Sequence, residues 1–174
     1  MRAIFLDRDG VINRSFIKNG KPKAPLNIKD LIFLPNVKDK LIKIKKKNFL
    51  IIVISNQPDI QKGLISIKTI ESMNKKILSS LPIDEIYICP HSKDFGCDCR
   101  KPRNKFFKKA INKYDINPLK SFMVGDRKSD IDSVLSLKIP SIFIDRNYSE
   151  PKPFSQISTF RSSSKALNYI LENL

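Results

Sequence analysis

Two aspartates follow the first apolar run of the chain, where Ala3–Leu6 leads into Asp7, Arg8, Asp9 and Gly10. Residues two positions apart in an extended chain point to the same side, so both carboxylates can reach one site. Open parallel sheets bind ligands beyond the carboxyl ends of their strands, and a pair of like charges there calls for a cation or a shared proton. The pair therefore predicts chemistry that depends on a metal ion.

Small, polar and acidic residues end two later apolar runs in the same way. Ser55, Asn56 and Gln57 end one of them, and Asp126 ends another, with Asp130 four positions further on. Taken singly, Ser55 or Asp126 would be explained as a helix cap or a turn residue. Because three strand ends with related groups meet at one edge of a parallel sheet, we favour a common site.

The single histidine and all three cysteines lie within eleven residues, as Cys89, His91, Cys97 and Cys99. Three thiolates and one imidazole match a closed, tetrahedral zinc site. Since such a site leaves no position open, we expect zinc to fold the loop 89–99 and to take no part in the reaction. An odd number of clustered cysteines is a poor basis for a secreted disulfide scaffold.

The elements that position these groups follow from the apolar pattern, which predicts an alternating α/β domain with a central parallel sheet. Short apolar runs predict strands at 3–6, 49–54, 83–88, 122–124 and 141–144. Apolar residues spaced three and four apart predict helices at 37–47, 67–80, 105–114, 129–137 and 165–171. The strand ends then gather at one edge of the sheet.

Length and composition predict one domain over residues 1–174, because 174 residues that are 41% hydrophobic suffice for a core. The absence of a long apolar stretch or a leader pattern predicts a soluble cytoplasmic protein with no membrane partner, and we expect a monomer. The net charge of +16 suggests an anionic partner. The basic residues are spread along the chain, however, and the run Lys43–Lys47 fits a solvated helix face better than a nucleic-acid surface.

Four segments resemble, in order, the motifs of the haloacid dehalogenase superfamily of phosphotransferases. The resemblance covers nearly the whole chain and implies a Rossmann-like domain. The segments are Asp7-Arg8-Asp9-Gly10-Val11, Ser55-Asn56-Gln57, Lys101-Pro102, and Gly125-Asp126 with Asp130.

The resemblance implies a role for each motif residue. Asp7 would be the nucleophile that forms an aspartyl phosphate, and Asp9 would be the general acid and base. Ser55 and Lys101 would hold the phosphoryl oxygens as charge develops on them. The implied site for Mg²⁺ consists of Asp7, the main-chain carbonyl of Asp9, and Asp126.

The role of Asp130 has three readings. It would orient Lys101 or a metal-bound water, or it would be an ordinary acidic residue on the surface of a helix.

The Cys/His loop narrows the resemblance, because it runs directly into Arg100-Lys101-Pro102. Together with the first motif, it is similar to the D-glycero-D-manno-heptose 1,7-bisphosphate 7-phosphatases, which lack a cap domain. The implied reaction removes the 7-phosphate of a small phosphorylated sugar during heptose biosynthesis for surface glycans such as lipopolysaccharide. Arg100 would hold the unreacted phosphate. Further substrate contacts are expected from Arg8, Asn56, Gln57 and Arg127.

Three other functions stay open at this point. The short spacing from His91 to Cys97, and the segment 15–18 in place of the family's usual sugar contacts, keep a histidinol-phosphate phosphatase as the alternative. A nucleic-acid-binding or 3′-end-processing protein is motivated by the charge, although the Cys/His loop argues against it. The intact set of motif residues argues against a purely structural zinc adaptor.

Overall fold

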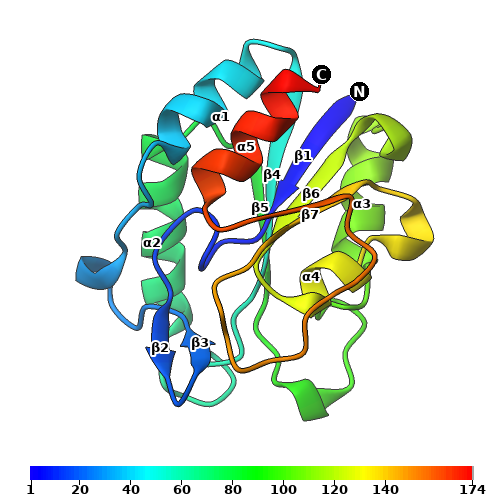
Figure 1. Ribbon diagram of the computed structural model, residues 1–174. Coiled ribbons are helices and arrows are strands. Elements are labelled where there is room, and N and C mark those ends of the chain that lie inside the picture. The colour runs from blue at the N-terminus through cyan, green and yellow to red at the C-terminus, as the bar shows by residue number, and fades with distance from the viewer. Residues whose placement is uncertain (174) are drawn as a thin grey trace.

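A six-stranded parallel sheet in the order β5-β4-β1-β6-β7-β8 forms the centre of the computed structural model, which describes residues 1–173 (Figure 1). The amino-terminal strand β1 lies between β4 and β6, so the segment after it lies near the middle of the sheet edge. The α/β class with a parallel sheet is thus confirmed. The strands are β1 (Arg2–Leu6), β4 (Phe49–Asn56), β5 (Glu85–Cys89), β6 (Phe122–Gly125), β7 (Ser141–Ile144) and β8 (Ser158–Phe160).

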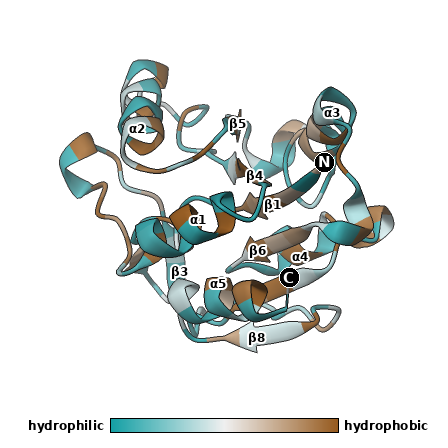
Figure 2. Cartoon of the chain, turned by 90° about the horizontal axis from the view of Figure 1, so that it is seen from above, coloured by the Kyte–Doolittle hydropathy of each residue, from teal (hydrophilic) through white to brown (hydrophobic). Residues whose placement is uncertain are grey.

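Helices cover both faces of the sheet (Figure 2). Helices α1 (Val37–Lys45), α2 (Ile67–Ser80) and α5 (Ser163–Glu172) lie on one face, and α3 (Lys105–Tyr114) and α4 (Lys128–Asp132) lie on the other. Strand β1 supplies alternate residues to the two cores, because successive side chains of a strand point to opposite faces. Its contributions are Ile4 and Leu6 to the first core and Ala3 and Phe5 to the second.

The predicted helix 129–137 is wrong beyond Asp132, where α4 ends. A short 3-10 helix, η4 (Leu135–Leu137), follows it. The amides of Val134, Leu137 and Lys138 bond to carbonyls three residues back, as in a 3-10 turn. The apolar residues keep a helical spacing through this break, and that spacing misled the prediction.

The other predicted bounds differ mainly at their ends. Helices α2 and α3 and strand β7 have the bounds predicted, whereas β4 continues to Asn56 and β5 runs from Glu85 to Cys89. Strand β1 begins at Arg2, β6 continues to Gly125, α1 ends at Lys45, and α5 runs from Ser163 to Glu172.

The apolar pattern did not predict two elements of the structure. One is edge strand β8, and the other is an antiparallel hairpin of β2 (Phe16–Lys18) and β3 (Lys21–Lys23). The carboxyl ends of the sheet strands, the hairpin and the loop after β7 all lie at the lower end of Figure 1, opposite the amino terminus. Any site at the strand ends is therefore walled by these segments.

Candidate active site and Cys/His cluster

Lys101 lies at the centre of the acidic strand ends. Its Nζ is 2.7 Å from Asp7 Oδ1 and 2.8 Å from Asp130 Oδ1. It also donates a hydrogen bond of 2.5 Å to the carbonyl of Ile54, at the end of β4. The lysine is 3% exposed and Asp7 is 7% exposed. The fold therefore brings the predicted nucleophile and the predicted phosphoryl-binding lysine into one buried ion pair.

The electrostatics of this centre favour an additional cation. Burial raises the pKa of Asp7 to about 6, against the charge of Lys101. Burial also holds the pKa of Asp126 well above its ordinary range, and the charges of Asp7 and Asp130 add to the effect. For Lys101, burial alone would lower the pKa, but Asp130 and Asp7 outweigh it and raise the pKa. Three buried carboxyl groups thus lie close together, and one ammonium group pairs with two of them.

Asp130 uses both carboxylate oxygens within the protein. Its Oδ2 accepts hydrogen bonds from the main-chain N–H groups of Asp126 (3.1 Å) and Arg127 (3.0 Å), while Oδ1 faces Lys101. A Cβ at Gly125 would lie 2.2 Å from the Cβ of Asp130, so only glycine allows this close packing. The arrangement holds Lys101 in place, which is one of the roles predicted for Asp130.

Asp126 keeps one carboxylate oxygen free. Its Oδ2 accepts a 2.6 Å hydrogen bond from the hydroxyl of Tyr148, whereas Oδ1 is buried and has no hydrogen-bond partner among the residues described. Carboxylate oxygens of Asp7, Asp126 and Asp130 lie within 4.8 Å of one another. A Cβ at Gly10 would lie 1.8 Å from Asp126 Oδ2, which explains the glycine. An all-oxygen donor set with an unpartnered buried oxygen fits a hard divalent cation.

Asp9 is held by three buried side chains. Gln57 Nε2 donates to it at 2.6 Å, Asn13 Nδ2 at 2.8 Å and Arg8 Nε at 3.2 Å. Gln57 also donates to Ser55 Oγ at 2.9 Å. Arg8 and Gln57, which were predicted to contact substrate, are therefore buried against Asp9 and do not line the cleft described below. Asn13 belongs to the same group, although no role was predicted for it.

Asn56 fastens the backbone of Lys101 to the end of β4. Its side-chain amide donates to the Lys101 carbonyl and accepts from the Lys101 N–H, each at 3.1 Å. In the β4–β5 register Asn56 lies opposite Cys89, and the N–H of Gln57 donates to the Cys89 carbonyl at 2.7 Å. The end of β4 thus connects the acidic centre with the Cys/His loop.

A cleft of about 190 Å³ opens above Asp7 and Asp9. Arg100 lines it; its guanidinium donates to the carbonyl of His91 at 2.9 Å, and burial lowers its pKa. Arg127 lines it too and forms a two-bond pair with Glu150, at 2.8 and 2.5 Å. The remaining lining residues are Lys21, Pro22, Lys23, Ala24, Asn56, Pro58, Asp59, Lys62, Lys101, Ser129 and Asp130.

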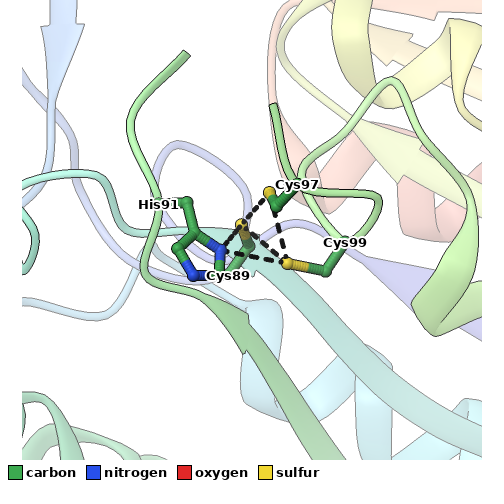
Figure 3. A group of neighbouring side chains, drawn as sticks. All are labelled: Cys89, His91, Cys97 and Cys99. Atoms are coloured by element: carbon green, nitrogen blue, oxygen red, sulfur yellow. Dashed lines mark hydrogen bonds between the residues drawn. The ribbon is translucent and has the colours of Figure 1, made fainter. Parts of the chain in front are cut away.

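The four predicted zinc ligands converge on one point (Figure 3). Their side chains point toward one another, with contacts from 3.2 Å (Cys89 Sγ to Cys99 Sγ) to 3.6 Å (Cys89 Sγ to Cys97 Sγ). His91 Nδ1 lies 3.3 Å from Cys99 Sγ, and all three cysteines are free thiols. Bonds of roughly 2.3 Å to a tetrahedral ion imply separations of about 3.8 Å between its ligand sulfurs. The cluster therefore has the ligand types and the approximate size of a zinc site.

The thiols are placed where a cation would change their protonation. Burial raises the pKa of Cys89 to about 12 and also raises the pKa of Cys99, so without a cation these two thiols stay protonated at neutral pH. The ring of His91 is stacked on Phe95 of the 3-10 helix η2 (Lys93–Phe95), with ring centroids 4.3 Å apart. Apart from this turn, the loop has little regular structure to hold its shape.

Comparison with known proteins places the chain among phosphatases. The family model for polynucleotide kinase 3 phosphatase matches residues 4–157. The D-glycero-beta-D-manno-heptose-1,7-bisphosphate 7-phosphatase of Haemophilus influenzae is 33% identical over 149 residues, covering 79% of this chain and 78% of the relative. The D-glycero-alpha-D-manno-heptose-1,7-bisphosphate 7-phosphatase of Campylobacter jejuni is 30% identical over 176 residues, covering 98% of this chain and 96% of the relative.

Solved structures share the fold. The D,D-heptose 1,7-bisphosphate phosphatase from B. bronchiseptica, complexed with magnesium and phosphate, superposes with a TM-score of 0.86 at 20% identity and full coverage of both chains. The enzyme of the same description from Burkholderia thailandensis gives 0.66 at 17% identity, with 98% of this chain and 99% of the other covered. Within residues 1–173, no helix is both long and apolar enough to cross a membrane.

The family model covers most of the chain, and relatives at 30% identity or more span over three quarters of it. The chain therefore belongs to the polynucleotide kinase 3 phosphatase family within the haloacid dehalogenase superfamily, in the branch of the D-glycero-D-manno-heptose-1,7-bisphosphate 7-phosphatases.

Proposed function

We propose that this chain removes the 7-phosphate of D-glycero-D-manno-heptose 1,7-bisphosphate. One observation carries the proposal: Asp7 lies buried at the floor of a small cleft, paired with Lys101 at 2.7 Å, with Asp9 in the same cleft. A nucleophilic carboxylate beside an acid–base carboxylate is the arrangement that phosphoryl transfer through an aspartyl phosphate requires. The named substrate of the relatives supplies the identity of the sugar.

The reaction assigns one step to each aspartate. The carboxylate oxygen of Asp7 that does not contact Lys101 attacks phosphorus. The bond from phosphorus to the sugar oxygen breaks as Asp9 gives the sugar oxygen a proton. Asp9 then takes a proton from water, whose oxygen attacks phosphorus and releases Asp7 and inorganic phosphate. Lys101 stabilises charge on the phosphoryl oxygens, and Gln57 and Asn13 keep Asp9 oriented.

The residues present fit Mg²⁺ as the catalytic cation. We assign Asp7, Asp126 and the main-chain carbonyl of Asp9 as its ligands. Asp126 Oδ1 is buried without a hydrogen-bond partner among the described residues, whereas both oxygens of Asp130 are already used. When bound, Mg²⁺ supplies positive charge that offsets the repulsion between a phosphate group and the carboxylates.

The Cys/His cluster fits Zn²⁺ bound by Cys89, His91, Cys97 and Cys99. A closed site with four protein ligands has a structural role. Lys101 follows Cys99 by two residues, so the loop that zinc would fold is the loop that presents the catalytic lysine. We extend the proposal to a monomeric enzyme of the cytoplasm that acts in nucleotide-heptose biosynthesis for surface glycans.

A phosphate-release panel tests the proposal. The substrates are both anomers of heptose 1,7-bisphosphate, histidinol phosphate and a 3′-phosphorylated oligonucleotide, each assayed with Mg²⁺. Both anomers belong in the panel, because the relatives include enzymes named for each. We expect the highest kcat/KM with one of the heptose bisphosphates. Preference for the oligonucleotide, the substrate class in the family's name, would overturn the proposal. Preference for histidinol phosphate would overturn the proposed substrate and favour a histidinol-phosphate phosphatase instead.

A further inference from the structure

The segment that follows β7 contacts two parts of the acidic centre. Its Tyr148 donates a hydrogen bond to Asp126 Oδ2. Two residues earlier, the guanidinium of Arg146 donates two hydrogen bonds to the carbonyl of Gly10, from Nη2 at 2.8 Å and from Nε at 3.1 Å. Gly10 directly follows Asp9 in the loop after β1. One short segment thus holds both the Asp126 side chain and the backbone beside Asp9.

The charge of Arg146 is directed at this backbone. Its guanidinium forms no ion pair within residues 1–173, because the adjacent carboxylate, Asp145, pairs with Lys152 and Arg161. The side chain of Arg146 is half-buried, and its Nη2 also donates to Ser163 Oγ at 3.0 Å, at the start of α5. Arg146 therefore uses a full positive charge to hold a main-chain carbonyl of the loop after β1.

Gly10 needs such a contact, because its residue type does not fix its own conformation. Its φ is +91°, and a Cβ there would lie 1.8 Å from Asp126 Oδ2 and 3.0 Å from the Tyr148 hydroxyl, so no larger residue fits. Glycine adopts many backbone conformations with similar ease. The close approach of this loop to Asp126 thus requires a flexible residue, and other groups must hold it in place.

Both peptide groups that flank Gly10 are hydrogen-bonded. The Gly10 N–H belongs to the same planar peptide group as the Asp9 carbonyl, and it donates to the Asn13 carbonyl at 2.7 Å. The Gly10 carbonyl lies in the next peptide group and accepts from Arg146. The contact with Asn13 stays within the turn, whereas Arg146 ties the turn to the segment after β7. Together the two contacts fix the backbone of Gly10 and the orientation of the Asp9 carbonyl.

We propose that Arg146 is a positioning residue for the divalent cation of the active site. It acts through Gly10 and holds the orientation of the Asp9 carbonyl. The role rests on the proposed function, which assigns this carbonyl as a ligand of Mg²⁺ beside Asp7 and Asp126. Groups that orient the ligands of a metal ion raise the affinity of its site. Loss of Arg146 should therefore weaken cation binding more than it slows the enzyme once the cation is bound.

Binding of Mn²⁺ alone, followed by electron paramagnetic resonance, tests the role without turnover. Arg146→Met keeps an unbranched side chain but loses all donors, so the dissociation constant should rise about tenfold. Arg146→Lys keeps one donor group for the carbonyl and should bind about threefold more weakly than wild type. In hydrolysis of p-nitrophenyl phosphate, the Mg²⁺ concentration for half-maximal rate should rise by the same factors. The kcat at saturating Mg²⁺ should change less.

Two control variants separate this role from general effects on the fold or the charge. Ser163→Ala removes the other hydrogen bond of Arg146 and leaves the contact with Gly10. Arg161→Met removes a basic residue that donates to Asn147 in the same segment. Both controls should keep the wild-type affinity for Mn²⁺. Circular dichroism checks that each variant is folded.

An unchanged Mn²⁺ affinity in Arg146→Met would overturn the role, and Arg146→Lys decides in the same way if the methionine variant does not fold. An equal loss of affinity in Ser163→Ala or Arg161→Met would also overturn it. A wild-type protein that binds no Mn²⁺ would overturn the role together with the assigned cation site. If the affinity falls as expected but heptose bisphosphate is not hydrolysed, the positioning role stands and the proposed substrate does not.

Discussion

The acidic cluster and the Cys/His cluster both gather cation ligands, but the chain builds them in opposite ways. The acidic ligands come from the ends of β1 and β6. Lys101, which pairs with Asp7, is 94 positions away from it in the sequence. The sheet and its two cores fix their positions. The Cys/His ligands lie within eleven residues, on a loop whose only helical part in the described chain is one 3-10 turn.

Under the proposed function, this difference separates a site that would use a cation for chemistry from one that would use a cation to hold its shape. Packing of β1 between β4 and β6 holds the carboxylates together whether or not a cation is bound. The free energy of zinc binding, in contrast, would fold the Cys/His loop. Removal of Mg²⁺ should therefore stop turnover and leave the fold intact, whereas removal of zinc should change both.

The largest expected effect comes from Asp7→Asn. The amide has nearly the same volume but is a poor nucleophile, so kcat should fall by about four orders of magnitude or more. Phosphate release measures the loss, and circular dichroism should show an unchanged fold. Asp39→Asn, an exposed aspartate on α1, is the control and should keep full activity. Turnover retained by Asp7→Asn would remove Asp7 as the nucleophile.

Cys97→Ser should break the other cluster. We expect the loss of one bound zinc per chain and a free energy of unfolding that is lower by about 4 kcal/mol, with lower activity because Lys101 is presented by the same loop. Elemental analysis and urea denaturation measure these changes. The neighbouring variant Asp98→Asn should keep the zinc, because its side chain is 72% exposed. A freshly purified wild-type protein without zinc would contradict the assignment.

The pH dependence of stability sharpens the comparison. The pKa of Asp7 is raised from 3.8 to about 6, so between these values the folded protein binds more protons than the unfolded chain. The stability from this carboxyl is full below about pH 4 and is lost as the pH rises through 6, up to about 3 kcal/mol. As the pH rises through 6, the free energy of unfolding of the metal-free wild type should therefore fall relative to that of metal-free Asp7→Asn, which has no carboxyl group at this position. Parallel curves for the two proteins in urea denaturation would exclude the effect.

Tyr148→Phe should have the smallest effect. It removes the hydroxyl that orients Asp126 and keeps the ring. We expect the Mg²⁺ concentration for half-maximal activity to rise about fivefold, with a smaller change in kcat. Binding of Mn²⁺ followed by electron paramagnetic resonance gives a readout independent of turnover. Tyr169→Phe, on α5, is the control; a shift of equal size there would show that the effect is not specific to Asp126.

The sequence predicted those parts of the site that local patterns encode. Buried parallel strands are apolar runs, so the polar residues that end them, such as Asp7 and Asp126, mark the sheet edge. The Cys/His ligands are close in sequence, so their spacing alone suggested the cluster. Their placement together is observed, whereas their roles in metal binding and catalysis stay predictions.

Other parts depend on contacts between distant segments. The hairpin is exposed and contains Pro22, so it has no apolar alternation that would predict its strands. Sequence alone did not show that Gln57 turns toward Asp9 or that Arg8 is buried. Tyr148 had a detectable signal, because it follows the end of β7 at the same sheet edge as the acidic residues.

The central position of β1 has a consequence for biosynthesis. Strand β1 is synthesised before both of its partners, residues 49–56 and 122–125, which lie on its two sides. Asp7 is therefore synthesised before the groups that surround it, and it meets Lys101 and Asp130 only after residues 101–130 have emerged. A chain that ends before Lys101 would have the proposed nucleophile without the lysine that pairs with it, so phosphate release would report that these distant segments have come together.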